Sequence, residues 1–392
     1  MRVLHVIGGL NPASGGPSSV IVSVSAAQAA GHAVTVLTTR ETAAAGPMAK
    51  ATATIPHFGK VTILDIEPQS GRLNMFTPVE PGQLKALMAN CDIVHLHGLW
   101  EPILLQVSRA ARSAGKPYVI TPHGMLDTWA LKKSRLKKAV ALYLVGYLSM
   151  IKHAAAHQAL SSHEAECITN ARYGPPIETL PNGVFLEQID PLPAIGTFRA
   201  SSPQLQAFVG ADPYIIFLAR LAPGKGLAII ADALGLLAPK HPRLKWLIAG
   251  PDFGARAPLQ AQLAELGIAD HVRLLGPIYD KSKFAAMVDA ACFVLPSEHE
   301  GFSMSIVEAM ACGCPVVISP QCHFNQVAEH QAGFTVPRTA AANAQAIDTI
   351  LSDPQAALAM SQRARSLVQA RYTWPAVAQA MIQWYERLLA SR

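Results

Sequence analysis

Residues 292–317 read CFVLPSEHEGFSMSIVEAMACGCPVV and indicate the class of fold to expect. A short apolar run at 292–295 is followed by a polar loop, a helical pattern from Ser303 and a second apolar run that begins at Val316. A strand, a helix and another strand in this order form a βαβ unit, and strands that are apolar throughout are buried on both faces. This stretch therefore predicts an α/β fold built on a parallel sheet.

The same alternation of strand and helix continues over nearly the whole chain, which indicates doubly wound sheets. It is interrupted once, at 186–213, where the periodicity is lost and prolines and glycines collect as in a linker. The expected strands lie at 3–7, 33–38, 61–66, 93–96, 118–121 and 156–160 before this interruption, and at 214–218, 244–249, 272–275, 292–295, 316–319 and 333–336 after it.

The length of the chain agrees with two domains, because 392 residues exceed one ordinary hydrophobic core. We expect one Rossmann-like domain at 1–183 and a second at 184–373. The last helical pattern begins at Trp374 and has apolar residues on one face, so residues 374–392 are expected to pack back on the first domain. Hydrophobic residues make up 51% of the chain against 15% charged, which excludes a disordered protein.

The net charge of +6 lies entirely in the first half of the chain. Residues 1–185 hold 16 Lys and Arg against 10 Asp and Glu, whereas 186–392 hold 16 of each. A basic lobe favours an anionic partner such as a phosphate or an acidic lipid surface. The run LKKSRLKK at 131–138 precedes an apolar stretch, so 131–148 could form a peripheral contact with a membrane; a solvated helix start before a buried helix is the alternative. The basic run lacks interleaved aromatic residues, and we expect no nucleic acid partner.

The sequence lacks the features of a secretion signal, and its longest apolar run, 139–151, is shorter than the ~20 residues of a membrane-spanning helix. We therefore expect a cytoplasmic protein, with any peripheral contact on the inner face of the membrane. The six cysteines are expected to be reduced, and Cys312 and Cys314 lack zinc spacing. His95 and His97 share one face of a strand, but no third ligand is evident, and we expect no metal site.

The first expected strand runs into a glycine-rich loop, GGLNPASGGP at 8–17, which precedes a helical pattern from Ser18. Free N–H groups and the positive dipole end of such a helix bind anions, so a diphosphate could lie near Gly15 and Gly16. The spacing differs from the dinucleotide-binding fingerprint and from the phosphate-binding loop of NTPases. A tight turn without a ligand is the alternative interpretation.

Two loops in the second half follow expected strands, which is where doubly wound folds bind ligands. The first carries Arg220 and Lys225, and a guanidinium with an ammonium group suits a diphosphate. The second carries Glu300, and Glu308 follows on the next helix, about 12 Å further along if both residues were helical. These two carboxylates could accept hydrogen bonds from the hydroxyls of two sugar rings. Solvated surface charge is the alternative for each group.

The second loop and its helix resemble the Glu-x7-Glu motif of family 4 retaining glycosyltransferases, and Arg220 and Lys225 resemble the cations of that family. The resemblance extends to DIVHLHG at 92–98, TPHGML at 121–126 and PNGV at 181–184. It implies the GT-B fold, in which two Rossmann-like domains face a central cleft. It also implies transfer of a hexosyl group from a UDP- or GDP-sugar to a saccharide or lipid-linked acceptor, without a metal or other cofactor, in polysaccharide or glycolipid synthesis.

The resemblance further implies a role for each site residue. Arg220 and Lys225 would bind the diphosphate of the donor, with Glu308 on its ribose and Glu300 on the transferred sugar. The N-terminal domain would bind the acceptor, and the Gly15 and Gly16 loop would close against the phosphates. The implied catalytic residues are His123, Glu300, Arg220 and Lys225, and further donor contacts fall at Gly301, Phe302, Ser303 and Met304.

Two alternatives share this architecture. A sugar-nucleotide epimerase of the GT-B type would bind the same donor without an acceptor. A non-catalytic nucleotide-sugar-binding protein is the second alternative. The presence of Arg220, Lys225, Glu300 and Glu308 together disfavours it.

Overall fold

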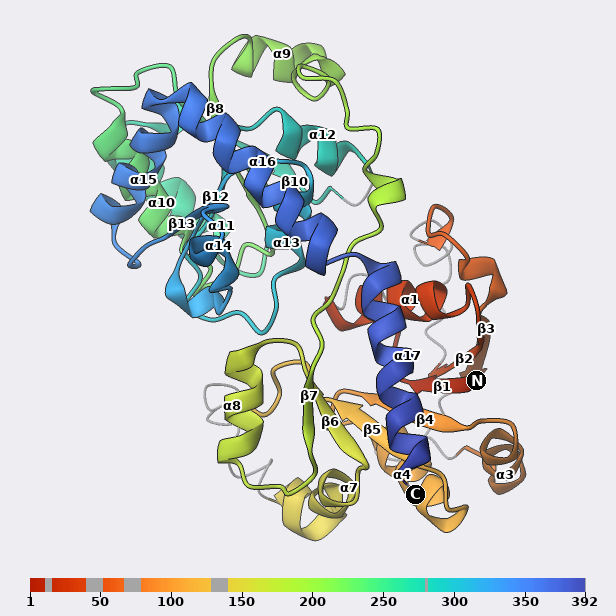
Figure 1. Cartoon of the computed structure of the whole chain (residues 1–392). Coiled ribbons are helices and arrows are strands. Elements are labelled where there is room, and N and C mark those ends of the chain that lie inside the picture. The colour runs from red at the N-terminus through yellow and green to blue at the C-terminus, as the bar shows by residue number, and fades with distance from the viewer. Residues whose placement is uncertain (11–15, 40–51, 67–78, 128–139, 279–280, 392) are drawn as a thin grey trace. The chain divides into compact units, whose positions relative to one another are not determined.

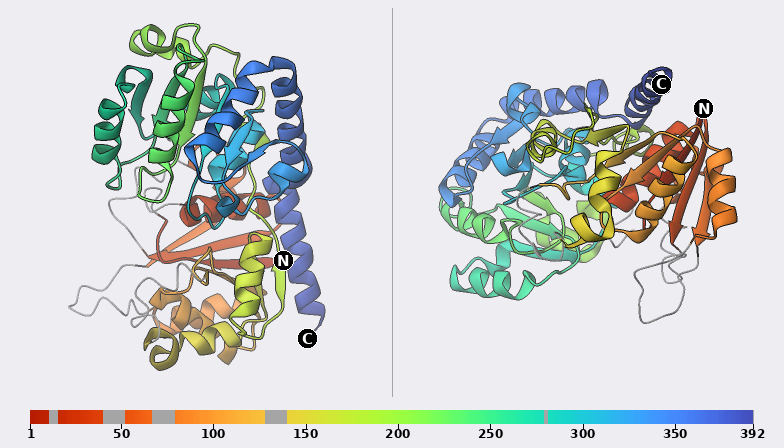
Figure 2. Two further views of the ribbon diagram at one scale, coloured as in Figure 1. Left: turned by 90° about the vertical axis from the view of Figure 1, so that its left-hand side faces the viewer. Right: turned by 90° about the horizontal axis from the view of Figure 1, so that it is seen from below.

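The computed structural model describes residues 1–10, 16–39, 52–66, 79–127, 140–278 and 281–391. The chain divides into two compact units, one formed by Met1–Phe185 with Trp374–Arg392 and the other by Leu186–Thr373. These divisions fall close to the boundaries expected from the loss of periodicity and from the last helix. Figures 1 and 2 show that each unit is a twisted sheet flanked by helices.

The sheet of the first unit has seven strands in the order β3-β2-β1-β4-β5-β6-β7, and all neighbours are parallel. Every strand expected in this half is confirmed, whereas β7 was not expected. Its residues Ile177–Thr179 form a short, partly exposed edge strand without an apolar run, so periodicity gives no signal there. The strands are β1 (Arg2–Val6), β2 (Ala33–Thr39), β3 (Thr62–Ile66), β4 (Ile93–His97), β5 (Tyr118–Thr121), β6 (Ala156–Ala159) and β7 (Ile177–Thr179).

Helices cover both faces of this sheet, because right-handed crossovers on the two sides of β1 place their helices on opposite faces. Figure 1 shows α1 and α17 side by side on one face, and these two helices contact each other. Trp374 begins α17, is buried, and donates its N–H to the Val184 carbonyl over 3.0 Å. The helices are α1 (Gly16–Gln28), α3 (Pro81–Ala89), α4 (Pro102–Ser113), α7 (Tyr147–Lys152), α8 (Ser162–Asn170) and α17 (Trp374–Ala390), with single turns η3 (Phe58–Lys60) and η4 (Ala141–Val145).

The sheet of the second unit has six parallel strands in the Rossmann order β10-β9-β8-β11-β12-β13. All the strands expected in this half are confirmed, because each is a short run rich in apolar residues. Four of them, β8, β9, β11 and β12, are also largely buried. The strands are β8 (Tyr214–Leu218), β9 (Lys245–Ala249), β10 (Val272–Gly276), β11 (Cys292–Leu295), β12 (Val316–Ile318) and β13 (Gly333–Thr335), and the helices are α9 (Pro203–Val209), α10 (Leu227–Leu237), α11 (Arg256–Glu265), α12 (Ser282–Val288), α13 (Met304–Ala311), α14 (Gln326–Glu329), α15 (Ala340–Ser352) and α16 (Pro354–Arg371).

The stretch 186–213 is not a plain linker, and this part of the sequence prediction is wrong. It contains α9, which begins at Pro203 and is capped by the hydroxyl of Ser202. A proline at the first position of a helix does not disrupt it, because the N–H that proline lacks has no partner within the helix at that position. The buried carboxylate of Asp289 accepts backbone N–H groups of Phe198 and Arg199 over 2.9 and 3.1 Å. The stretch therefore folds as part of the second unit.

Among the residues described, no helix combines the length and apolar character needed to cross a bilayer. The apolar run that begins at 139 is divided by Gly146, whose φ of 109° ends the turn η4 before α7. All six cysteines are buried and free, in agreement with the prediction of reduced thiols.

Candidate functional site

The order of the second sheet reverses between β8 and β11, and ligands of doubly wound folds bind outside the carboxyl ends of the strands at such a point. The loop after β8, 219–226, and the loop after β11, 296–303, therefore emerge side by side. They are joined directly, since the Glu298 N–H donates to the Gly224 carbonyl over 2.6 Å. The topology thus brings together the two loops that the sequence selected separately.

Gly226 allows this close approach. Its φ is 81°, in the left-handed region, and a Cβ added there would lie 2.3 Å from the Pro296 carbonyl oxygen. Only glycine fits both the backbone angle and the space. The same residue precedes α10, so it sets where the loop ends and the helix begins.

Lys225 and Glu300 form an ion pair across the two loops, with 2.6 Å between Nζ and Oε1. Their side chains are 17% and 11% exposed, so the pair is largely shielded but still open to a ligand. Arg220, on the same loop as Lys225, is exposed, and its guanidinium lies 5.2 Å from the centre of the Phe253 ring. An ammonium group and a carboxylate expected to bind one donor are thus in direct contact.

Glu308 lies on α13 and pairs with Lys283 of α12, with 2.6 Å between Nζ and Oε1. Lys283 is the cation that the sequence reading missed, because KSKF at 281–284 resembles the surface charge of any helix start. No spacing rule connects residues 283 and 308. Only the packing of α12 against α13 brings them together.

The start of α13 faces this same edge of the sheet and leaves backbone N–H groups without the usual cap. Ser303 is the N-cap residue, but its hydroxyl lies 3.1 Å from that of Ser305 and makes no capping bond. Helix-start N–H groups of this kind bind anions. Met304 begins the helix and Gly301 lies in the loop before it, whereas the Phe302 ring packs on Phe324, with ring centres 5.5 Å apart. Any contact of Phe302 with a donor would therefore come from its backbone.

The first sheet reverses its order between β1 and β4, and the glycine loop follows β1. Gly16 begins α1, as an anion-binding helix start requires, and Gly15 lies outside the described residues. The Gly8 N–H donates to the carboxylate of Glu101, the residue before α4. No local pattern points to Glu101, because Gly8 and Glu101 lie far apart in the chain and meet only at this reversal.

His123 follows β5, beside the same edge. Its φ is 53°, an uncommon left-handed conformation for a residue with a side chain, and such backbone is frequent at functional sites. The next residue, Gly124, donates its N–H over 2.6 Å to the buried carboxylate of Glu164. The Nε2 atom of His123 lies 3.2 Å from Nδ1 of His97, and burial lowers the pKa of His123 to about 4. The ring is therefore neutral at physiological pH.

His5, His95 and His97 are fully buried, and one nitrogen of each lies within 4.8 Å of the others, a distance that suggests a metal site. However, both nitrogens of each ring have protein partners within hydrogen-bonding distance. Hydrogen bonding accounts for the three buried rings, and the pair that raised the question of a metal is part of a polar network.

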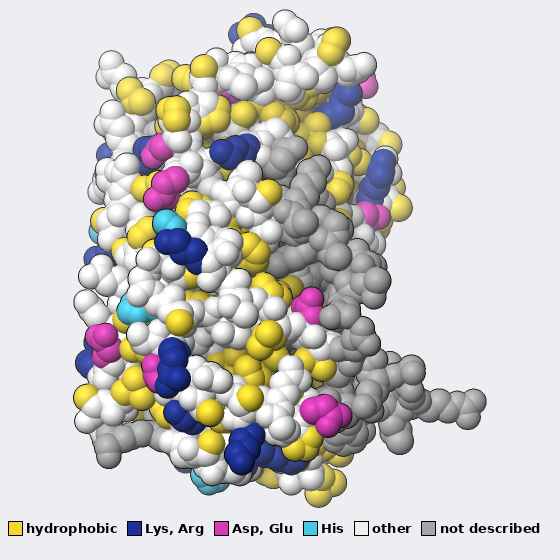
Figure 3. All heavy atoms as spheres, turned by 90° about the vertical axis from the view of Figure 1, so that its right-hand side faces the viewer, with side chains coloured by type: hydrophobic (Ala, Val, Ile, Leu, Met, Phe, Trp, Pro, Cys, Tyr) yellow, Lys and Arg dark blue, Asp and Glu magenta, His cyan; other side chains and the backbone are white. Residues whose placement is uncertain are grey.

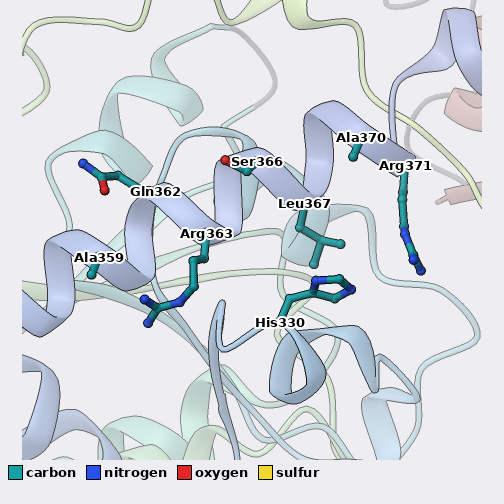
Figure 4. Close-up of a pocket in the computed structure, with 8 residues that line it drawn as sticks. All are labelled: His330, Ala359, Gln362, Arg363, Ser366, Leu367, Ala370 and Arg371. Atoms are coloured by element: carbon teal, nitrogen blue, oxygen red, sulfur yellow. The ribbon is translucent and has the colours of Figure 1, made fainter.

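Two of the hollows formed by the described residues lie in the second unit. One, of about 350 Å³, is lined by loop residues that include Gly224, Gly226 and Arg338, and it adjoins the loop that carries Lys225. The other, of about 380 Å³, lies between α16 and His330 at the end of α14, where Arg363 and Arg371 point toward it (Figure 4). None of the residues that line this second hollow belongs to the loops 219–226 and 296–303.

Charged side chains of both signs are mixed on the face of the molecule in Figure 3. Several Lys and Arg side chains lie near one another at its lower end. The absence of a nucleic acid partner remains a prediction.

Comparison with known proteins agrees with this geometry. The model of the family "Glycosyl transferases group 1" matches residues 199–367, and that of "Glycosyltransferase Family 4" matches residues 14–188. The phosphatidyl-myo-inositol mannosyltransferase of Mycolicibacterium smegmatis is 29% identical over 368 residues, covering 91% of this chain and 86% of the relative. The GDP-mannose:cellobiosyl-diphosphopolyprenol alpha-mannosyltransferase of Xanthomonas campestris is 26% identical over 395 residues, covering 100% and 98%.

A solved structure with the same fold is that of Anabaena HepE in complex with UDP and glucose, with a TM-score of 0.77, 19% identity and coverage of 99% of this chain and 100% of that one. The family models together cover most of both units, and the fold agrees over the whole length. The chain therefore belongs to the family 4 glycosyltransferases and has their GT-B fold of two Rossmann-like domains.

Proposed function

We propose that this glycosyltransferase moves a hexosyl group from a UDP- or GDP-sugar to a saccharide or lipid-linked acceptor, with retention of anomeric configuration, in glycolipid or polysaccharide synthesis. The observation that carries the proposal is the Lys225–Glu300 pair at the reversal point of the second sheet. The two mannosyltransferase relatives make GDP-mannose the first donor to test, and their names support a lipid-linked acceptor.

The proposed mechanism uses fixed positive charge. As the bond between sugar and diphosphate breaks, negative charge grows on the leaving diphosphate. Lys225, Arg220 and the N–H groups at the start of α13 would stabilise that charge more in the transition state than in the ground state. Since these groups supply the charge that a divalent cation supplies elsewhere, we propose a reaction that needs no metal and no further cofactor.

The carboxylates would bind the hydroxyls of the donor. When the donor phosphate binds, it would replace the Glu300 carboxylate as the partner of Lys225. Glu300 would then accept hydrogen bonds from the transferred sugar. Glu308 would bind the ribose, with Lys283 orienting the carboxylate. From the first unit, His123 would face the reacting sugar, and the loop with Gly15 and Gly16 would contribute N–H groups toward the phosphates.

Nucleotide binding is the direct test. A ligand at 100 times its dissociation constant should stabilise the protein by about 2.7 kcal/mol, which is measurable as a thermal shift with UDP, GDP, ADP and their sugars. Nucleotide release from the stabilising donor should then depend on an added acceptor, and EDTA should leave the rate unchanged. NMR of the product should show the anomeric configuration of the donor.

The outcomes separate the alternatives. Conversion of the donor sugar without an acceptor would identify an epimerase, and stabilisation without turnover with any acceptor would favour a binding protein. The absence of a shift with every nucleotide would contradict the proposal itself.

We also propose a peripheral contact with membranes on their cytoplasmic side. The basic run 131–138 lies outside the described residues, but the turn that follows exposes apolar side chains, with Tyr143 73% and Leu144 81% exposed. Such residues beside a basic segment suit the surface of an anionic bilayer.

Replacing Tyr143 and Leu144 together with serine should weaken binding to vesicles that contain phosphatidylglycerol by about tenfold or more, because each apolar side chain contributes about 1.5–3 kcal/mol when fully buried. Co-sedimentation measures this change. The control is Leu358→Ser, which removes a side chain that is 60% exposed in the second unit and should leave binding unchanged. Equal binding of all three proteins would exclude the contact at this turn.

A further inference from the structure

A chain of buried polar side chains connects α1 to His123 within the first unit. Gln28 of α1 has its Oε1 atom 2.7 Å from Nε2 of His5, and Nδ1 of His5 lies 2.9 Å from Nε2 of His97. Nδ1 of His97 then lies 3.2 Å from Nε2 of His123. Each link joins the Nδ1 atom of one ring to the Nε2 atom of the next.

The direction of this chain follows from its first member. The amide oxygen of Gln28 can only accept, and the amide nitrogen points instead to the sulfur of Met381, 4.0 Å away. His5 must therefore carry its proton on Nε2. A neutral imidazole has one donor and one acceptor, so Nδ1 of His5 accepts a proton from Nε2 of His97. Since His97 carries its proton on Nε2, its Nδ1 is an acceptor. Nε2 of His123, which faces that atom, is therefore the donor.

All three rings are neutral, which this derivation needs. Burial lowers the pKa of His5 and His123 to about 4 and lowers the pKa of His97 well below its usual range. A second proton on Nδ1 of His5 or of His97 would place two donors face to face at one of the links. The arrangement with the proton on Nε2 of every ring satisfies each of the three hydrogen bonds.

We propose that Gln28, His5 and His97 are positioning residues that hold His123 in its Nε2–H tautomer, so that its Nδ1 accepts a hydrogen bond from a hydroxyl of the bound sugar. The part that concerns the sugar rests on the proposed function. The opposite tautomer would leave Nδ1 of His97 facing a second lone pair inside the protein, and an unpaired buried acceptor costs about 1–3 kcal/mol. That cost is enough to select one tautomer by a factor of about 5 to 150.

The backbone at His123 is also held in place. His123 is held in the left-handed conformation, and the carboxylate of Glu164 binds the N–H groups of both Gly124 and Leu160, at 2.6 and 2.7 Å. Both the backbone at His123 and the protonated nitrogen of its ring are therefore set before any substrate binds.

A second polar chain on the same strand provides a natural control. The Tyr385 hydroxyl lies 2.6 Å from Nδ1 of His95, whose Nε2 lies 2.6 Å from the Thr121 hydroxyl. That hydroxyl donates to Gln158, whose amide nitrogen donates to the Leu180 carbonyl. His95 is as buried as His97 and stacks on it, with 4.1 Å between the ring centres, but its two hydrogen bonds go to Tyr385 and Thr121 and not to His97 or His123.

The tautomer can be measured without any assay of activity. In protein labelled with ¹⁵N-histidine, two-bond ¹H–¹⁵N spectra should show a protonated Nε2 and an unprotonated Nδ1 for His123, assigned by comparison with His123→Asn. The opposite pattern, or a mixture of tautomers, would overturn the proposal whatever the enzyme transfers.

A matched pair of variants tests the role of His97. In His97→Asn the amide oxygen can replace the accepting Nδ1, whereas in His97→Gln the amide nitrogen can replace only the donating Nε2. We expect His97→Asn to keep the His123 tautomer and to stay within about threefold of the native kcat. His97→Gln should lose the single tautomer and lower kcat about tenfold or more, with little change in the Kd of the nucleotide.

His95→Gln is the control for a purely structural effect, and it should lower the melting temperature while the His123 spectrum stays native. Equal kcat and equal spectra for the two His97 variants would overturn the proposal. If the native protein transfers no sugar at all, the proposed function fails, and the spectra of the two His97 variants still decide the tautomer.

Discussion

Replacing Lys225 with alanine is expected to lower kcat for sugar transfer by about 100-fold or more, the size of effect seen when one preorganised group that stabilises transition-state charge is removed. The ammonium group lies 2.6 Å from Glu300 and is only 17% exposed, so water cannot readily take its place. Initial rates of nucleotide release from the active donor, at saturating acceptor, measure the change.

The control for this experiment is Lys240→Ala. Lys240 also forms a 2.6 Å ion pair, with Asp348, but its side chain is 61% exposed and belongs to the helical surface of the same unit. Exposed pairs contribute at most about 1 kcal/mol, so this variant should keep its rate and most of its stability. Rates for Lys225→Ala equal to those of the native enzyme would show that the phosphate does not bind at Lys225.

Loss of Lys225 also leaves the Glu300 carboxylate without its cation, which could lower the rate through stability alone. The double variant Lys225→Ala with Glu300→Gln removes that uncompensated charge. We expect it to recover melting temperature but not activity. Recovery of the rate together with stability would mean that Lys225 has only a structural role.

Gly226→Ala is expected to destabilise the second unit by about 3 kcal/mol or more and to lower transfer strongly. The added Cβ would lie 2.3 Å from the Pro296 carbonyl oxygen, and the φ of 81° strains any residue with a side chain. For a unit of this size, about 3 kcal/mol corresponds to a fall of roughly 6–12 °C in melting temperature. Since the two loops must separate, the Lys225–Glu300 distance should increase as well.

Gly254→Ala separates backbone strain from the clash. Gly254 has a φ of 90°, but no atom lies within 4 Å of the position that a Cβ would take. This variant should cost only about 1 kcal/mol, from the left-handed backbone alone. Similar melting temperatures for the two variants would show that close packing against Pro296 is not the cause.

The strands could be predicted from the sequence because each is a short run rich in apolar residues between a polar loop and a helical pattern. β7 and α9 could not. The first is a short edge strand without an apolar run, and the second begins at prolines that resemble a linker. The prediction of 186–213 as a linker failed because the contacts of Asp289, which anchor that stretch, come from a distant part of the chain.

The residues of the candidate site also fall into those with a local sequence signal and those without one. Local patterns select Arg220, Lys225, Glu300 and Glu308, since each follows an expected strand or lies on the helix after it. The partners Lys283 and Glu101 give no local signal, and their contacts arise only where α12 packs on α13 and where the first sheet reverses its order.

The sequence by itself determined the two parallel sheets and the family, because these depend on burial patterns and short motifs within neighbouring residues. Only the tertiary structure decided which charges pair and how His5, His97 and His123 share their protons. Those properties depend on distances between residues that are far apart in the chain, and a hydrogen bond forms only when its two atoms come within about 3 Å.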